Sequence, residues 1–140
     1  MEQNSSNFAQ DATIVGPYFE NEFAEFWVEE GILHFVYKPG AVLTLEAAKL
    51  VVKDRLAFQK GESRKVLCDL RGLREADRSA RDYLAKQGSE QLEAVAMLID
   101  SSVTRIIMNF YINLSRPETP TRVFTDRIEA LEYLRKRKKK

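Results

Sequence analysis

The residues of this chain that could bind an anion gather between an apolar segment and a predicted helix start. Four arginines fall within eleven residues there. They are Arg71, Arg74, Arg78 and Arg81. Guanidinium groups bind phosphate and carboxylate through paired hydrogen bonds, and the free amides at a helix N-terminus attract the same anions. Together with Asp77 and Ser79, these arginines form a candidate loop for binding an anion or a protein partner.

The same loop has a structural interpretation that needs no ligand. Asp77 suits the N-cap of a helix, because its carboxylate can accept hydrogen bonds from the free amides of the first turn. Arg78 and Arg81 can pair with Asp82 or Glu75 on the surface, where ion pairs contribute little to stability. These acidic neighbours also offset the positive charge of the arginines. We therefore expect this segment to cap a helix.

Residues suited to catalysis or to metal binding are few. The chain has one cysteine, Cys68, and one histidine, His34. Cys68 lies within an apolar run, where a buried structural thiol is the simplest interpretation. The sequence has no glycine-rich phosphate loop, no Gly-x-Ser-x-Gly motif and no pair of metal ligands at a familiar spacing. We predict that the protein is not an enzyme and has no cofactor and no metal.

The composition is that of an ordinary folded domain with a basic end. The 140 residues suit one domain, and 44% hydrophobic with 31% charged residues is typical of a folded chain. The last six residues, 135–140, are all basic, so the part before them carries a net charge of −5. An acidic body argues against a broad nucleic-acid interface. Because no apolar run is long enough for membrane insertion and no signal pattern begins the chain, we expect a cytoplasmic protein.

The hydrophobic pattern predicts a hairpin followed by alternating helices and strands. Strands at 24–29 and 32–37 flank a tight turn at Glu30-Gly31. Helices are expected at 44–59, 77–87, 101–114 and 125–134, and further strands at 64–70, 94–99 and 122–124. A strand is the alternative for 101–114, but the spacing of its apolar residues favours a helix. The order β-β-α-β-α-β-α-β-α implies an α/β domain with a mixed five-stranded sheet and four helices.

The pattern also predicts the boundaries of the domain and its core. We expect one domain at 24–135, after a polar, partly flexible segment at 1–23 and before a basic tail at 136–140. The core residues should come from the inward positions of strands and helices. They are Phe26, Val28, Leu33, Leu45, Val52, Leu56, Val66, Leu67, Leu84, Val95, Met97, Ile106, Phe110, Val123 and Leu134.

Two stretches resemble the STAS or SpoIIAA-like family of bacterial domains, which includes the anti-sigma-factor antagonists. In the antagonists an apolar strand ends in Asp-Leu, and a short loop leads to an Asp-Ser-Ser/Thr-Gly helix start. Here Asp69-Leu70 ends the strand, and Asp77-Arg78-Ser79-Ala80 stands at the helix start. The segment 123–131 is similar to the last strand and helix of the family, and the resemblance spans roughly residues 24–135. It implies a mixed sheet with helices.

Two residues depart from the antagonist motif. Arg78 occupies the position of the serine that accepts phosphate, and Ala80 replaces the glycine. Ser79 is kept, but it lies one residue further into the helix, which turns it by about 100° around the axis. The chain is therefore closer to the uncharacterised SpoIIAA-like branch, and we predict no dedicated phosphorylation switch at Ser79.

The resemblance implies a non-catalytic regulatory or protein-interaction module with an unidentified protein partner, and a homodimer stays open. The alternative is a small-ligand binder. Its ligand would be an anion at the 71–81 loop, or an apolar, lipid-like molecule between the sheet and a helix. A deep apolar cavity beneath the helix at 101–114 would favour ligand binding, whereas a flat surface there would favour docking.

Overall fold

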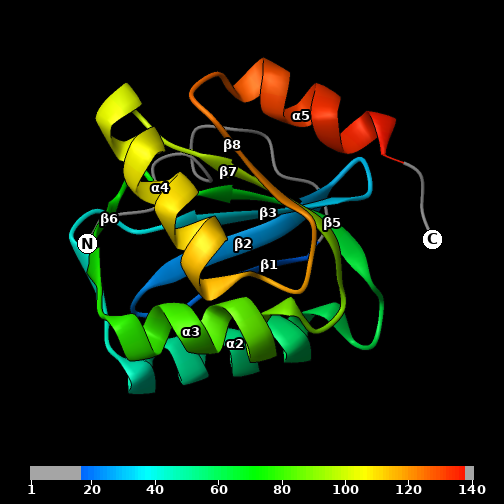
Figure 1. Ribbon diagram of the computed structural model, residues 1–140. Helices are drawn as coiled ribbons and strands as arrows, with labels where there is room; N and C mark the ends of the chain where they lie inside the picture. The colour runs from blue at the N-terminus through cyan, green and yellow to red at the C-terminus, as the bar shows by residue number, and fades with distance from the viewer. Residues whose placement is uncertain (1–16, 138–140) are drawn as a thin grey trace.

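The computed structural model describes residues 17–137 (Figure 1). Within this range, seven side chains of one helix lie outside the description: those of residues 102–104, 106, 107, 110 and 111. The described part confirms the predicted α/β class, with a mixed sheet and four α-helices.

The main sheet has six strands in the order β1-β2-β3-β5-β7-β8, so the predicted count of five was too low. The strands are β1 (Tyr18–Glu20), β2 (Ala24–Glu29), β3 (Ile32–Tyr37), β5 (Arg64–Asp69), β7 (Leu92–Leu98) and β8 (Thr121–Phe124). Strands β1, β2 and β3 are antiparallel, and β3, β5, β7 and β8 are parallel, as the predicted crossovers require. The missed strand, β1, has only three residues and is held by its pairing with β2.

The predicted hairpin is confirmed together with its turn. Glu30 and Gly31 have φ angles of 53° and 80°. Two successive positive φ angles make the turn whose twist matches that of the strands. The turn sets Val28 opposite Leu33, so both side chains face the same side of the sheet.

A second, two-stranded parallel sheet lies where the sequence indicated loops. It pairs β4 (Ala41–Leu43) with β6 (Leu73–Ala76), so the candidate loop at 71–81 contains a strand. Gly72 directly precedes β6, and a Cβ there would lie 2.5 Å from the backbone oxygen of Tyr37. Strands this short show no periodicity along the chain, because a long-range pairing defines them.

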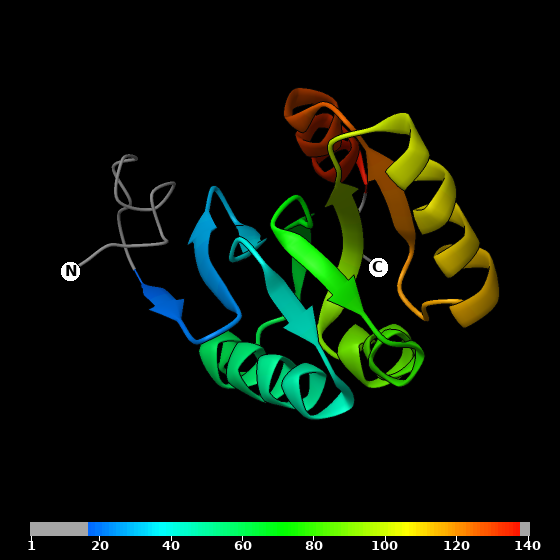
Figure 2. The same cartoon turned by 90° about the vertical axis from the view of Figure 1, so that its left-hand side faces the viewer.

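The helices cover both faces of the main sheet (Figures 1 and 2). They are α2 (Leu45–Gln59), α3 (Arg78–Lys86), the 3₁₀ helix η1 (Gln87–Ser89), α4 (Ser102–Ser115) and α5 (Arg127–Lys136). Figure 2 shows α2 and α3 on one face and α5 on the other. Helix α4 packs against β8 and α3. Its helical state confirms the prediction for 101–114 over the strand alternative.

Predicted caps begin three of the four described α-helices, namely α2, α3 and α5. Thr44 Oγ1 accepts a hydrogen bond from the Ala47 amide at 3.2 Å, and this bond starts α2. Asp126 accepts one from the Ile128 amide at 2.9 Å at the start of α5. Such caps satisfy amides that have no partner within the helix. The helix starts are thus local features, independent of the sheet.

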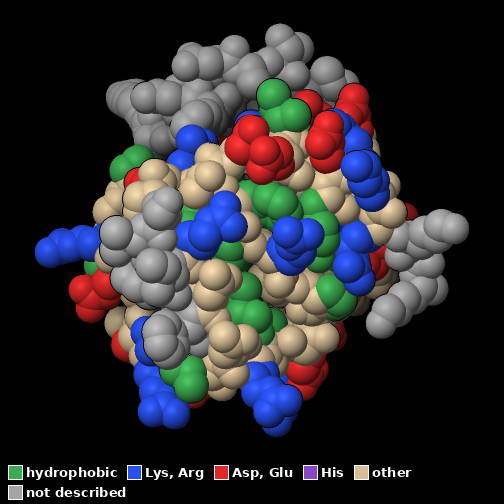
Figure 3. All heavy atoms as spheres, turned by 45° about the horizontal axis from the view of Figure 1, so that its top comes forward, with side chains coloured by type: hydrophobic (Ala, Val, Ile, Leu, Met, Phe, Trp, Pro, Cys, Tyr) green, Lys and Arg blue, Asp and Glu red, His purple; other side chains and the backbone are tan. Residues whose placement is uncertain are grey.

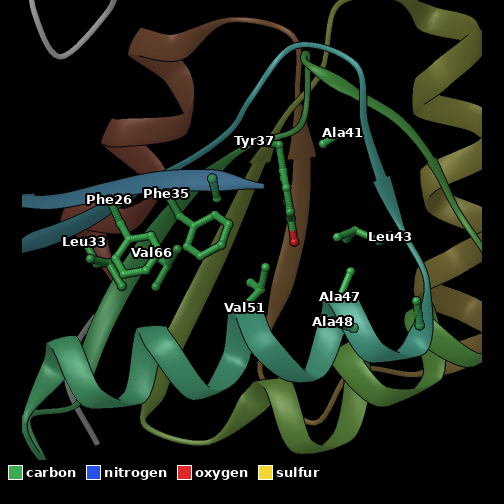
Figure 4. Packing of buried hydrophobic residues seen from close by; sticks show 12 residues of the cluster. Phe26, Leu33, Phe35, Tyr37, Ala41, Leu43, Ala47, Ala48, Val51 and Val66 are labelled. Atoms are coloured by element: carbon green, nitrogen blue, oxygen red, sulfur yellow. The ribbon is translucent and has the colours of Figure 1, made fainter. Parts of the chain in front are cut away.

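The larger core lies between the sheet and α2. Figure 4 shows Phe26, Phe35 and Tyr37 pointing from the sheet toward Val51 of α2. The rings of Phe26 and Phe35 stack with their centroids 5.1 Å apart. A second cluster of buried residues forms under α5 on the opposite face. Each face of the sheet therefore has its own apolar layer.

Most of the predicted core residues are buried. They are Phe26, Leu33, Val52, Val66, Leu67, Val95, Val123 and Leu134. Five others are only half-buried, namely Val28, Leu45, Leu56, Leu84 and Met97. Ile106 and Phe110 lie on α4, but their side chains are outside the described residues. The prediction was least accurate on α2, whose buried face includes Val51, Arg55 and Gln59 in place of Leu45 and Leu56.

Candidate functional site

Asp77 and Ser79 form a helix start whose polar groups bond to one another. The Asp77 carboxylate accepts hydrogen bonds from the Ala80 amide at 2.9 Å and from the Ser79 hydroxyl at 2.8 Å. These bonds lower the pKa of Asp77, with the amide as the larger cause. The predicted N-cap is confirmed. The Ser79 hydroxyl takes part in this cap. The absence of a dedicated phosphorylation switch at Ser79 stays a prediction.

The first three arginines of the candidate loop have different surroundings. Arg71 binds the buried carboxylate of Asp69 through Nε and a terminal nitrogen, at 3.0 and 2.8 Å. This bond raises the pKa of Arg71. Arg74 on β6 is exposed. The side chain of Arg78 is 86% exposed and lies 3.8 Å from the Asp82 carboxylate. The contacts of these arginines therefore do not converge on one anion position.

Arg81 differs from the others because it faces inward. A terminal nitrogen of its guanidinium donates to the backbone oxygen of Ala76 at 2.6 Å. The same side chain lines a cavity within the domain. Arg81 therefore links the predicted loop to a site that the sequence did not indicate.

This cavity lies between the sheet and helices α2, α3 and α4, and its volume is about 120 Å³. Its wall is mostly apolar. The apolar side chains of the wall include Phe35, Val66, Leu84, Leu92, Met97 and Met108, which come from five elements. Helix α4 and the segment after it supply Met108, Pro117 and Thr119. A cavity is therefore present beneath the helix predicted at 101–114. At this position a cavity favours ligand binding, whereas a flat surface would favour docking.

A buried arginine forms part of the cavity wall. Arg55 on α2 is only 4% exposed. Its guanidinium donates to the side-chain oxygen of Gln59 and, at 3.1 Å, to the backbone oxygen of Gly88. Both acceptors are uncharged, and no ion pair of Arg55 occurs within the described residues. Burial lowers the pKa of Arg55 to about 10, so the group stays cationic near neutral pH.

Sequence reasoning missed Arg55 because a charged residue on a helix is usually assigned to the solvent side. The signal was its spacing. Arg55 follows Val51 by four residues and Ala48 by seven, which places it on the apolar stripe of α2. Gln59 continues the stripe and is also buried. A polar pair at core positions of a helix was thus visible in the printed sequence.

The groups most suited to nucleophilic chemistry lie on opposite faces of the sheet. Cys68 lines the cavity, and burial raises the pKa of its thiol to about 12. His34 points to the other face, where its ring stacks on Trp27 with centroids 5.4 Å apart. Burial, with a smaller effect of Arg127, lowers the pKa of His34 to about 4. The two side chains therefore do not form a Cys-His pair.

The described residues contain no group of three or more His, Cys, Asp or Glu side chains placed to hold a metal. None of the helices in the described part is long and apolar enough to cross a membrane. Figure 3 shows one face on which basic and acidic side chains surround a patch of hydrophobic ones. Among the described side chains of that face, both signs of charge are mixed.

Comparisons with known proteins place this geometry in a family. No curated protein matches the sequence. A similar solved structure is that of an uncharacterized protein of the DUF3478 family with a SpoIIAA-like fold, from Shewanella loihica PV-4. The two sequences are 14% identical, the match covers 88% of this chain and 98% of that chain, and the TM-score is 0.58. This likeness confirms the predicted SpoIIAA-like fold.

A family model also matches residues 26–138, and these include every described element from β3 to α5. The family's description assigns it no activity. The protein belongs to the family described as "Domain of unknown function (DUF7793)".

Proposed function

We propose that this STAS-like domain is a non-catalytic module that binds a small, largely apolar molecule in its central cavity. The observation that carries the proposal is the cavity of about 120 Å³ between the sheet and helices α2, α3 and α4. Ligand sites are typically concave and mostly apolar, and this space, lined by side chains of the sheet and of three helices, has that character.

The size of the cavity suggests the size of the ligand. An engineered apolar cavity of about 150 Å³ in another protein stays dry and binds benzene. A cavity of about 120 Å³ thus suits an apolar body of similar dimensions. Ligand sites are typically apolar with a few well-placed polar groups. Phe35, Val66 and Met97 supply apolar surface here, while Arg55 and Arg81 supply polarity.

The absence of catalysis is part of the proposal and is supported by the chemistry of the wall. The Cys68 thiol has a pKa raised to about 12, so little of it is the reactive thiolate near neutral pH. His34, which could act as a base, points to the other face of the sheet. We place this binding function in the cytoplasm.

Ligand-induced stabilisation tests the proposal. A ligand that binds only the folded state stabilises it by about 2.7 kcal/mol at 100 times its Kd. The urea concentration at the midpoint of unfolding should therefore be higher in the presence of 1-hexanol or toluene. The variant Val66→Phe, which places a ring in the cavity, should lose this shift. If Val66→Phe does not fold, Val66→Leu replaces it and should show a smaller shift than the native sequence.

Val123→Leu is the matched control, since Val123 is buried but does not line the cavity. It should keep the ligand-induced shift. The proposal is wrong if neither compound changes the unfolding midpoint of the native sequence, or if the shift is the same in the Val66 variants.

A regulatory protein-interaction role is the second candidate. It is favoured by the exposed helix start, where Arg78 is 86% exposed and Arg74 also faces solvent. Such arginines can supply recognition at a docking surface. Affinity capture with the native chain and with Arg74→Glu/Arg78→Glu should then recover a partner only with the native chain. Equal recovery by both would exclude this surface as the contact.

A further inference from the structure

We propose that the ligand of the cavity is a small carboxylate, whose anionic group pairs with Arg55 while its apolar body fills the space beside it. This inference rests on the proposed function and adds the chemical class of the ligand. It assigns to Arg55 the role of charge recognition.

The first support is that the buried charge of Arg55 has no ion-pair partner within the described residues. The residue is 4% exposed, and its two hydrogen-bond acceptors, Gln59 and Gly88, are neutral. The negative charge of Glu90 offsets only part of the effect of burial on the Arg55 pKa, which stays lowered. Burying a cation without a directly paired counter-ion is costly, whereas an opposite charge in good geometry offsets part of that cost. The guanidinium is therefore a group to which a bound anion would be worth more than the same anion at an exposed arginine.

The second support is the remaining donor capacity of the guanidinium. Its bonds to Gln59 and Gly88 come from different terminal nitrogens. Each terminal nitrogen carries a second N–H, so two further hydrogen bonds are chemically available. A carboxylate has two oxygens that match this planar arrangement.

The third support is that Arg55 is held in position. The amide of Gln59 donates to the backbone oxygens of Glu62 at 2.7 Å and Gln91 at 3.0 Å. This fixes the Gln59 oxygen that accepts from Arg55. Gly88 lies in η1, directly after α3. A recognition group that neighbouring residues hold in place loses less entropy when the ligand binds.

A single carboxylate fits the charge of this wall better than a more highly charged group. Arg55 is the buried cation, whereas Arg81 is partly exposed and already donates to the Ala76 backbone oxygen. One ligand charge thus meets one fully buried cation. The apolar remainder of the wall offers little to the additional oxygens of a phosphate.

Arg55 could instead be purely structural, since it ties α2 to η1 through the Gly88 oxygen. A stability measurement alone does not separate the two roles. The preference for a charged ligand over an uncharged one of the same length does separate them. If Arg55 is purely structural, its substitution should leave the preference for the charged ligand unchanged.

The experiment compares hexanoate with 1-hexanol by isothermal titration calorimetry at neutral pH. The native chain should bind hexanoate about 10-fold or more tightly than 1-hexanol, because hydrogen bonds to charged groups are the stronger ones. Arg55→Gln should remove this preference while keeping affinity for 1-hexanol. Arg135→Gln is the control, because it removes the same charge from an exposed arginine of α5 that does not line the cavity, and it should keep the preference.

The outcomes separate this inference from the proposed function. Binding of 1-hexanol as tight as that of hexanoate overturns the carboxylate assignment and leaves the apolar site standing. A preference that survives in Arg55→Gln overturns the role of Arg55. If the native chain binds neither compound, the proposed function fails and the inference fails with it. Should Arg55→Gln not fold, Arg55→Lys replaces it and should show a weakened preference, whereas an unchanged preference would count against the role of Arg55.

Discussion

Replacing Val66 by isoleucine adds one methylene to the wall of the cavity and should stabilise the protein. Val66 is 3% exposed and lies on β5, where isoleucine is as suitable for a strand as valine. Burying one methylene contributes about 0.8 kcal/mol, so the variant should gain up to about that amount of stability.

Equilibrium unfolding in urea, followed by far-UV circular dichroism, measures the effect. The midpoint should rise while the slope of free energy against urea stays the same. The control is Val123→Ile, at a buried position that does not line the cavity. There the additional methylene has no cavity to fill, so it should not stabilise the protein, and overpacking would cost about 1–3 kcal/mol.

The sign of the change carries the test. A destabilised Val66→Ile, equal to the control, would mean that the wall around Val66 is closed in solution. The proposed ligand would then have no space beside Val66. A stabilised variant would show that the space exists and is not filled by neighbouring side chains.

Three further predictions concern the loop, the small sheet and the buried histidine. Asp77→Ala should lower the urea midpoint, because the Ala80 amide loses its acceptor, while Asp77→Asn should retain most of the stability. Gly72→Ala should cost about 1–3 kcal/mol in urea unfolding, because its Cβ would meet backbone at 2.5 Å, whereas Gly88→Ala makes only ordinary contacts from 3.5 Å and should cost less. Burial lowers the pKa of His34 from 6.5 to about 4, so the unfolded chain binds more protons between these values. Stability should therefore fall by up to about 3 kcal/mol as the pH falls from about 6.5 to 4, and His34→Gln should show a flatter profile in urea unfolding against pH.

Local signals account for what the sequence predicted correctly about the fold. The caps at Thr44, Asp77 and Asp126 depend on side chains within three residues of the amides they bind. The hairpin turn likewise follows from Glu30-Gly31 alone. Such features need no knowledge of the rest of the chain, which is why helix starts and the hairpin agree with the structure.

Long-range contacts account for what the sequence did not reveal. Strand β6 exists because it pairs with β4, more than twenty-five residues earlier in the chain. The acceptor that makes Arg55 tolerable in the core, the backbone oxygen of Gly88, lies 33 residues away. The cavity is formed by side chains from strands and helices throughout the domain. The hydrophobic pattern along the chain predicted the layers of the fold. The cavity was not predicted, because it arises from contacts between those layers.

The most direct test of the ligand site uses the methionines. Of the three in the chain, Met97 on β7 and Met108 on α4 line the cavity, and Met1 lies outside the described residues. Selective ¹³C labelling of methionine methyl groups gives signals that Met97→Leu and Met108→Leu assign. Titration with hexanoate should shift the signals of both Met97 and Met108, and Val66→Phe should suppress these shifts. Hexanoate binding that leaves both signals unchanged would place the ligand outside the cavity and exclude the cavity as its site.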